Sequence, residues 1–249
     1  MLKQNNLLVS SENKFIKNIR KLRNKKYRTQ QKQYVIESRK MILEAIKSSA
    51  SIDYILLSED IDESFEDFDV KYVSSSIFKE LSSLTTSDGY MAVINQKVYE
   101  SSPSDRVILL DRIQDPGNLG TIIRSAEAFG FESIYLYQSV DAYNDKTLRA
   151  SMGSIFRTNI LNIDKTQIEE LKKSHSFYIA DMDGVDYRIE EYPEKLALII
   201  GNEANGVSDI LSLMADKTIR IPMTSDIESL NAAISASLIM SEISSKRAE

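Results

Sequence analysis

The strongest constraint on the fold is an alternation of short apolar runs with helix-like segments that begins at Arg106. The apolar runs are predicted strands at residues 107–110, 133–137, 177–180, 196–200 and 218–221. Helix-like segments separate most of them, at residues 119–129, 145–155 and 168–173. Such strand–helix repetition predicts a mostly parallel sheet covered on both faces. Ligands of these sheets bind beyond the carboxyl ends of the strands.

The N-terminal part shows a less regular α/β pattern. Apolar residues at helical spacing predict a helical region over residues 15–48. Further on, the pattern predicts strands at 52–57, 70–73 and 90–94 and a helix at 76–84. The polar stretch 99–105 is typical of a linker. We therefore expect a small α/β domain over residues 1–97, a linker over 98–105 and a parallel-sheet domain over 106–249.

Charge is divided unevenly along the chain. Residues 1–40 hold 12 Lys/Arg and 2 Asp/Glu, whereas the rest of the chain holds 19 and 35. A basic segment on an otherwise acidic chain favours a polyanionic partner. Aromatic Tyr27 lies within the basic run, which favours RNA over a merely solvated helix face. The candidate RNA-binding residues are Arg20, Lys21, Arg23, Lys25, Lys26 and Arg28.

Several classes of site are disfavoured by residue content. With no cysteine, the chain has no disulfide, no thiolate metal site and no cysteine nucleophile. The single histidine, His175, is expected to be a surface or structural residue, and no metal site is predicted. The apolar runs are too short to cross a bilayer and no signal-peptide core precedes the first charges, so we expect a cytoplasmic protein without membrane contact.

The first of three polar stretches at strand ends runs from Asp115 to Arg124. Its apolar residues predict one buried helix stripe, formed by Leu119, Ile122, Ile123, Ala126 and Phe129. Asn118 is the expected N-cap, and Arg124 falls toward the polar side. The alternative is an ordinary capped helix in which Arg124 pairs with Glu127.

The second stretch, residues 201–206, follows the strand at 196–200. It lacks the lysine of a Walker A loop, since Val207 stands in that position, so nucleotide hydrolysis is not expected. Glycine at 201 would let a ligand lie against the backbone. A simple strand–loop–helix corner is the alternative.

The third stretch, residues 221–231, is predicted to lead from a strand into a helix that starts near Ser225 or Asp226. Ser225 and Glu228 have the spacing of a capping box. A buried stripe is predicted from Leu230, Ile234 and Leu238. Ser229 and Asn231 fall in the first turns, where free N–H groups favour polar or anionic ligands. A capped terminal helix without a ligand is again the alternative.

Together, in this order and spacing, the three stretches resemble the SpoU/TrmH family of RNA ribose 2′-O-methyltransferases, within the SPOUT superfamily. The resemblance covers about residues 107–243. It implies S-adenosylmethionine as cofactor, held by Gly201, Ile221, Met223 and Leu230. It also implies catalytic positions at Arg124, Asn118, Glu203, Ser229 and Asn231. Since a guanidinium rarely gives up its proton, we expect Arg124 to act electrostatically on the attacking 2′-oxygen.

The resemblance also implies an architecture. The parallel sheet is expected to carry a C-terminal trefoil knot and to form a homodimer. The N-terminal part resembles the L30e-like substrate-binding domain that often precedes this catalytic domain, although serine replaces the usual glycine at Ser38. That domain favours ribosomal RNA over tRNA as substrate. The alternatives are a tRNA 2′-O-methyltransferase, a base methyltransferase, and a non-catalytic RNA-binding protein that retains the fold.

Overall fold

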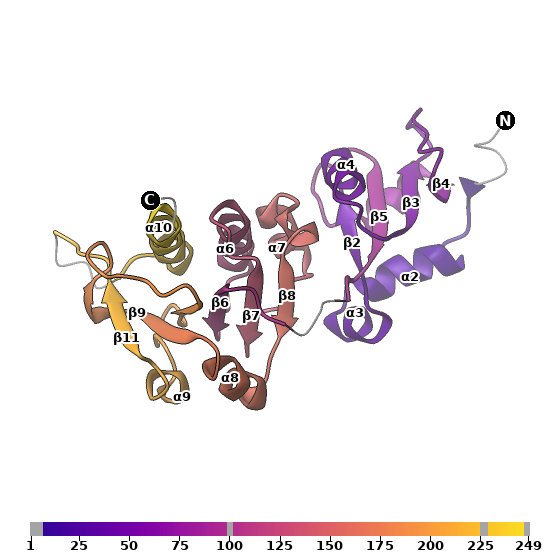
Figure 1. Cartoon of the computed structure of the whole chain (residues 1–249). Helices are drawn as coiled ribbons and strands as arrows, with labels where there is room; N and C mark the ends of the chain where they lie inside the picture. The colour runs from indigo at the N-terminus through magenta and orange to yellow at the C-terminus, as the bar shows by residue number, and fades with distance from the viewer. Residues whose placement is uncertain (1–6, 99–101, 225–228, 247–249) are drawn as a thin grey trace. The chain divides into compact units, whose positions relative to one another are not determined.

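The computed structural model describes residues 7–98, 102–224 and 229–246 of the chain. The chain forms two compact units, each with its own sheet and buried core (Figure 1). One unit consists of Met1–Val98 with Tyr143–Leu148, and the other of Tyr99–Ala142 with Arg149–Glu249.

The first unit is built on a mixed sheet with the strand order β1-β4-β3-β5-β2. Its strands are β1 (Leu7–Leu8), β2 (Gln33–Glu37), β3 (Ile52–Ser58), β4 (Val70–Val73) and β5 (Tyr90–Asn95). Strand β5 pairs antiparallel with β2 and β3, whereas β4 pairs parallel with β3 and β1. The helices are α2 (Lys14–Leu22), α3 (Lys25–Gln31), α4 (Arg39–Lys47) and α5 (Ser75–Leu81). The three predicted strands and the predicted helix near 76–84 are thereby confirmed.

The single helical region predicted over residues 15–48 is wrong, because strand β2 divides it. Tyr34, Val35 and Ile36 are all buried, and β2 pairs with β5 along its whole length. Three consecutive buried residues suit a strand covered on both faces, which helical spacing alone does not distinguish from a helix. The left-handed backbone of Lys32 (φ 54°) ends α3 and turns the chain into this strand.

The second unit contains a parallel sheet with the strand order β11-β9-β10-β6-β7-β8. Its strands are β6 (Arg106–Asp111), β7 (Ser133–Tyr137), β8 (Asn159–Asn162), β9 (Ser176–Asp186), β10 (Leu196–Ile200) and β11 (Lys217–Arg220). Every pairing is parallel, which confirms the predicted α/β class and adds β8, which the apolar pattern missed. Only Ile160 of β8 is buried, so this edge strand lacks a long apolar run.

Helices cover both faces of this sheet (Figure 1). Those of the second half of the chain are α6 (Pro116–Ala128), α7 (Asp145–Ser151), the 3₁₀ turn η1 (Ser154–Phe156), α8 (Lys165–Lys172), α9 (Asp209–Ser212) and α10 (Ala232–Ser245). Helices α8 and α9 pack on one face, over Phe177, Ile179 and Ile199. Helices α6 and α10 lie against each other on the opposite side of the sheet (Figure 1). The predicted helix over 145–155 is interrupted because Met152 and Gly153 both adopt positive φ.

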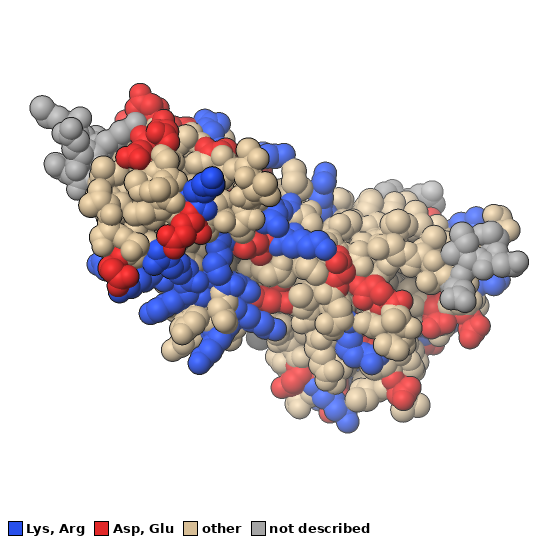
Figure 2. All heavy atoms as spheres, turned by 180° about the vertical axis from the view of Figure 1, so that it is seen from behind, with Lys and Arg blue, Asp and Glu red and all other residues tan. Residues whose placement is uncertain are grey.

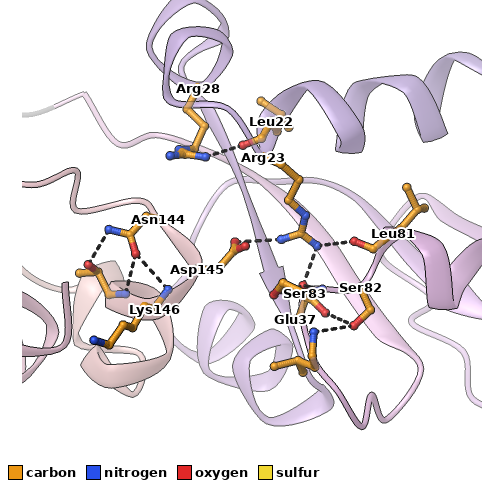
Figure 3. A network of polar contacts seen from close by, with 12 residues as sticks. Leu22, Arg23, Arg28, Glu37, Leu81, Ser82, Ser83, Asn144, Asp145 and Lys146 are labelled. Carbon is orange, nitrogen blue, oxygen red and sulfur yellow. Dashed lines mark hydrogen bonds and ion pairs between the residues drawn. The ribbon is translucent and has the colours of Figure 1, made fainter. Parts of the chain in front are cut away.

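A buried polar network joins the elements of the first unit (Figure 3). Glu37 is 8% exposed and accepts hydrogen bonds from Arg23 Nη2 (2.6 Å), Ser82 Oγ (2.6 Å), and the N–H and hydroxyl of Ser83 (2.9 and 2.7 Å). Arg23 also donates to the Leu81 carbonyl and to Asp145, at 2.8 Å each. Burial acts to raise the pKa of Glu37, but the Ser82 bond, the Arg23 charge and the Ser83 donors outweigh it and hold the pKa below its usual value.

Replacing Glu37 tests this network. Glu37→Gln removes the buried one of the two carboxylates that pair with Arg23, so we expect a loss of about 2 kcal/mol of unfolding free energy at pH 7. Because folding lowers the pKa of Glu37, its carboxylate contributes fully to stability above the ordinary glutamate pKa of about 4.3. That contribution is lost as the pH falls through the pKa of Glu37 in the folded protein. Thermal unfolding of both proteins from pH 7 to pH 3.5 should therefore show a shrinking difference. The exposed Glu66→Gln is the control, and a pH-independent difference would contradict the assignment.

Ser38 occupies a backbone conformation that suits glycine. Its φ of 98° and ψ of 146° fall in a region that costs side-chain-bearing residues about 1–3 kcal/mol. The hydroxyl offsets part of this cost by capping α4, accepting from Met41 N at 3.3 Å. We expect Ser38→Gly to raise the denaturant midpoint and Ser38→Ala, which keeps the strained Cβ, to lower it. Equal or lower stability of the glycine variant would disprove the strain.

Candidate functional site

The second unit contains a cavity of about 440 Å³ at the carboxyl edge of its sheet. The middle of β9, the ends of β10 and β11, and the start of α10 form its walls. The lining residues are Ala180, Asp181 and Met182 from β9, Ile200 at the end of β10, 201–204 and Gly206 after it, Ile219, Ile221 and Met223 at and beyond β11, and Ser229, Leu230, Ala232, Ser235 and Ile239 at α10. The location agrees with the general position of ligand sites in parallel sheets.

The four residues predicted to hold a cofactor all line this cavity. They are Gly201, Ile221, Met223 and Leu230, and the predicted catalytic residues Glu203 and Ser229 line it as well. The β9 residues Ala180, Asp181 and Met182 line the cavity as well, although the sequence motifs did not predict them. A polar run, Asp181-Met-Asp-Gly, follows the predicted strand 177–180 at the same sheet edge, and that position was an available signal.

Strand β9 reaches the cavity because it leaves the ladder for several residues. Thr218 pairs with Ile179, but the next residue, Ile219, pairs with Val185. The intervening residues of β9 bulge out of the pairing, and Ala180, Asp181 and Met182 among them line the cavity. The chain then passes Ile219 so closely that a Cβ on Gly184 would lie 2.5 Å from its backbone.

The loop after β10 is a compact hairpin. Asn202 and Gly206 exchange backbone hydrogen bonds of 2.9 and 3.0 Å, and the Asn202 side chain accepts from the N–H groups of Ala204 and Asn205. A Cβ on Gly201 would lie 2.3 Å from the carbonyl carbon of Gly206. Glycine at 201 is therefore needed for the loop to fold back, in addition to the ligand approach predicted from the sequence.

Asn118 joins the three polar stretches through its side chain. Its Nδ2 donates to Glu203 Oε1 at 2.9 Å, and its Oδ1 accepts from Asn231 Nδ2 at 2.9 Å. The prediction of Asn118 as N-cap is wrong. Asp115 caps α6 instead, accepting from the Asn118 N–H at 2.8 Å, with Pro116 in the first turn. Because Asp115 makes the cap, the Asn118 amide is available to the other two stretches.

Asn231 is the N-cap of the terminal helix, and its Oδ1 accepts from Ala233 N and Ile234 N. The helix therefore begins at Ala232, later than predicted, and the predicted capping box of Ser225 and Glu228 lies outside the described residues. The predicted buried stripe is also wrong, since Ile234 is 52% and Leu238 40% exposed. Apolar residues surround α10, so periodicity did not indicate which side packs; the Ser125–Ser237 hydroxyl contact of 2.7 Å shows the side that faces α6.

Arg124 is exposed on α6, opposite the buried residues Leu119, Ile122, Ile123 and Ala126. The predicted stripe is confirmed except at Phe129, which is half-buried. Glu127 pairs with Arg157 (Nη2 to Oε2, 3.2 Å), and not with Arg124 as the alternative supposed. Within the part of the chain that the structure describes, Arg124 has no acidic partner.

The six basic residues predicted to bind RNA divide into two groups. Arg28 is 6% exposed and donates to the Leu22 carbonyl at 2.7 Å, and Arg23 lies in the Glu37 network. Both therefore hold the fold together, because a planar guanidinium satisfies several acceptors at once. The other four are more exposed. Arg20 is half-buried and pairs with the exposed Glu80, and Lys21, Lys25 and Lys26 are exposed. Figure 2 shows Lys and Arg side chains gathered over this part of the first unit.

His175 is a buried structural residue, which is one of the two roles predicted for it. It is 5% exposed, and its ring nitrogens lie 2.9 Å from the Ser104 carbonyl and 2.8 Å from the Ser174 hydroxyl. Among the described residues, no group of three His, Cys, Asp or Glu side chains is arranged to hold a metal ion. The same residues include no helix long and apolar enough to span a membrane.

Two family models match the chain. Residues 105–241 match the SpoU rRNA Methylase family, and residues 13–92 match the MRM3-like substrate binding domain. Together these matches cover the α/β core of each unit.

Individual proteins are similar over nearly the whole chain. The chain is 32% identical over 238 residues to a 23S rRNA (guanosine(2553)-2′-O)-methyltransferase of Bacillus subtilis, covering 93% of this chain and 96% of that one. The AdoMet-bound rRNA methyltransferase of Sinorhizobium meliloti has a TM-score of 0.85 at 25% identity, with 96% and 97% of the two chains covered. The SpoU methyltransferase AviRb of Streptomyces viridochromogenes supports the fold, with a TM-score of 0.86 at 23% identity over 96% and 99%. With a family model over more than half its length and a relative this similar throughout, the chain belongs to the SpoU rRNA methylase family.

Proposed function

We propose that this protein transfers a methyl group from S-adenosylmethionine to a ribose 2′-hydroxyl of ribosomal RNA. The observation that carries the proposal is a cavity lined by the second and third polar stretches, to which the Asn118 side chain links the first stretch. Family membership and the named activity of the Bacillus subtilis relative support the same reaction. The family description, SpoU rRNA Methylase, and that relative's name favour ribosomal RNA over tRNA.

The cavity suits S-adenosylmethionine in size and chemistry. A volume of about 440 Å³ falls within the range of small-molecule sites. Ile221, Leu230 and Ile239 give the cavity apolar surface that suits the adenine ring. The carboxylates of Asp181 and Glu203 line the same cavity and complement a cationic ligand. When bound, the cofactor supplies an electrophilic methyl carbon.

Arg124 is proposed to stabilise the negative charge that develops on the attacking 2′-oxygen. An exposed guanidinium without an acidic partner among the described residues is suited to this role, and it cannot serve readily as a base. Asn118, Glu203, Ser229 and Asn231 are proposed to orient the substrate and the loops. Holding the hydroxyl at attack distance contributes much of the rate.

The basic face of the first unit is proposed to bind the RNA backbone. Arg20, Lys21, Lys25 and Lys26 are its contacts, without the structural Arg23 and Arg28. We further propose a substrate-binding domain over 1–97, a linker over 98–105 and a catalytic domain over 106–249, acting in the cytoplasm where ribosomes are assembled.

The trefoil knot and the homodimer are part of the same proposal. The close passage of Gly184 over Ile219 is consistent with a chain segment threaded beside β11. The exposed Ile234 and Leu238 on α10 give an apolar face suited to a second copy of the chain.

Cofactor binding is tested by calorimetric titration with S-adenosylmethionine. Leu230→Arg places a long charged side chain in the cavity, so we expect the Kd to rise at least about a hundredfold. Leu213→Arg is the matched control, because Leu213 is 88% exposed and does not line the cavity. Unchanged affinity in Leu230→Arg, with an intact fold, would refute this assignment of the cavity.

Catalysis is tested by substituting Arg124 and measuring 2′-O-methylated nucleosides in digested ribosomal RNA by mass spectrometry. We expect Arg124→Ala to lower turnover about 10²- to 10³-fold while cofactor affinity stays unchanged. Arg124→Lys, which retains the positive charge, should keep substantially more activity. Wild-type turnover in Arg124→Ala would remove Arg124 from the mechanism, whereas absence of methylation in the wild type would favour a non-catalytic RNA-binding protein.

A further inference from the structure

We propose that Asp111 is a positioning residue for the cofactor: together with Arg112 it fixes the loop 201–207 at the shape required for binding. The proposal rests on the proposed function, because it takes the cavity beside this loop as the S-adenosylmethionine site. Asp111 is the last residue of β6 and does not line the cavity. Its influence therefore has to pass through the loop.

The carboxylate of Asp111 holds one end of the loop. It is fully buried, and its Oδ2 accepts a 2.6 Å hydrogen bond from the backbone N–H of Ser208. Strands β6 and β10 are paired in register, with Leu110 opposite Ile200, so Asp111 lies level with the residue that begins the loop. Hydrogen bonds to a charged acceptor are shorter and stronger than neutral ones.

Arg112 holds the loop at two other points. Its carbonyl accepts from Asn202 Nδ2 at 2.8 Å, and its Nη2 donates to the Gly206 carbonyl at 3.3 Å. The positive φ of Arg112, 58°, turns the backbone so that both contacts are made. Its Nε also lies 3.3 Å from Asp111 Oδ1, outside hydrogen-bond geometry but close enough for charge attraction.

These contacts attach the hairpin at Asn202, Gly206 and Ser208, and so on both sides of Glu203 and Ala204, which line the cavity. The hairpin is held internally by the Asn202–Gly206 pairing, so it can shift only as one piece. Such a shift would displace Glu203, and with it the contact to Asn118. Hence the buried Asp111 carboxylate, which does not line the cavity, determines the position of the loop that forms one of the cavity walls.

A substitution at Ser208 can remove the hydrogen bond to Asp111 without changing a residue that lines the cavity. Its φ of −66° is the value that proline requires, and its N–H donates to Asp111. Ser208→Pro therefore deletes that donor, whereas Ser208→Ala keeps it and removes only the hydroxyl. We expect the Kd for S-adenosylmethionine to rise about tenfold in Ser208→Pro, and to stay within about twofold of the wild type in Ser208→Ala.

Asp111 variants give a second test that does not depend on tolerance of proline. Asp111→Asn retains an acceptor for Ser208 without the charge, so its affinity should lie between those of the wild type and Asp111→Ala. In RNA methylation assays the KM for the cofactor should rise in the same order, while kcat at saturating cofactor changes little. A merely structural Asp111 would lower thermal stability without this order.

The outcomes separate the two levels of the proposal. If the wild type binds and Ser208→Pro and the Asp111 variants bind equally well, the positioning role is overturned and the proposed function stands. If the wild type does not bind S-adenosylmethionine at all, the positioning role and the proposed cofactor site are both overturned.

Discussion

The central strand of the second unit, β10, pairs parallel with β6 on one side and with β9 on the other, and the site at the sheet edge depends on this pairing. Leu198 of β10 pairs with Ile108 and with Tyr178, and all residues of β10 are buried. Because parallel strands end at the same edge, the loops that follow β6 and β10 meet the bulge of β9 there. The apolar strands make this edge rigid, and the polar loops above it enclose the cavity. A site on such a support keeps its geometry better than one built on free loops.

Helix caps determine how the polar side chains at this edge are used. Asp115 satisfies the first turn of α6 and leaves the Asn118 amide free, while Asn231 caps α10 and still donates its amide to Asn118. Each of these contacts is individually modest in energy. They matter mainly for orientation. The caps fix where α6 and α10 begin, and therefore where the side-chain amides of Asn118 and Asn231 point. Asn118, Glu203 and Asn231 consequently come together from distant parts of the sequence.

In the first unit, structural and solvent-facing positive charges alternate along one basic run. Arg23 and Arg28 are tied to acceptors inside the unit, whereas Lys25 and Lys26 remain exposed. The difference follows from chemistry, since a guanidinium can satisfy several buried acceptors and an ammonium group is more strongly hydrated. Composition identified the basic face, but the sequence alone did not separate these roles.

Local sequence by itself determined the strands of the parallel sheet except β8, the buried stripe of α6, and the identity of the four predicted cofactor residues that line the cavity. The strands and the helix stripe follow from local periodicity, whereas the four cofactor residues were implied by the resemblance to the SpoU/TrmH family. Tertiary structure decided the features that depend on a distant partner. Pairing with β5 made residues 33–37 a strand, and packing on α6 chose the buried face of α10 and left Ile234 exposed. A local sequence pattern shows which residues are apolar. It does not show which distant segment will pack against them, because that contact forms only when the chain folds.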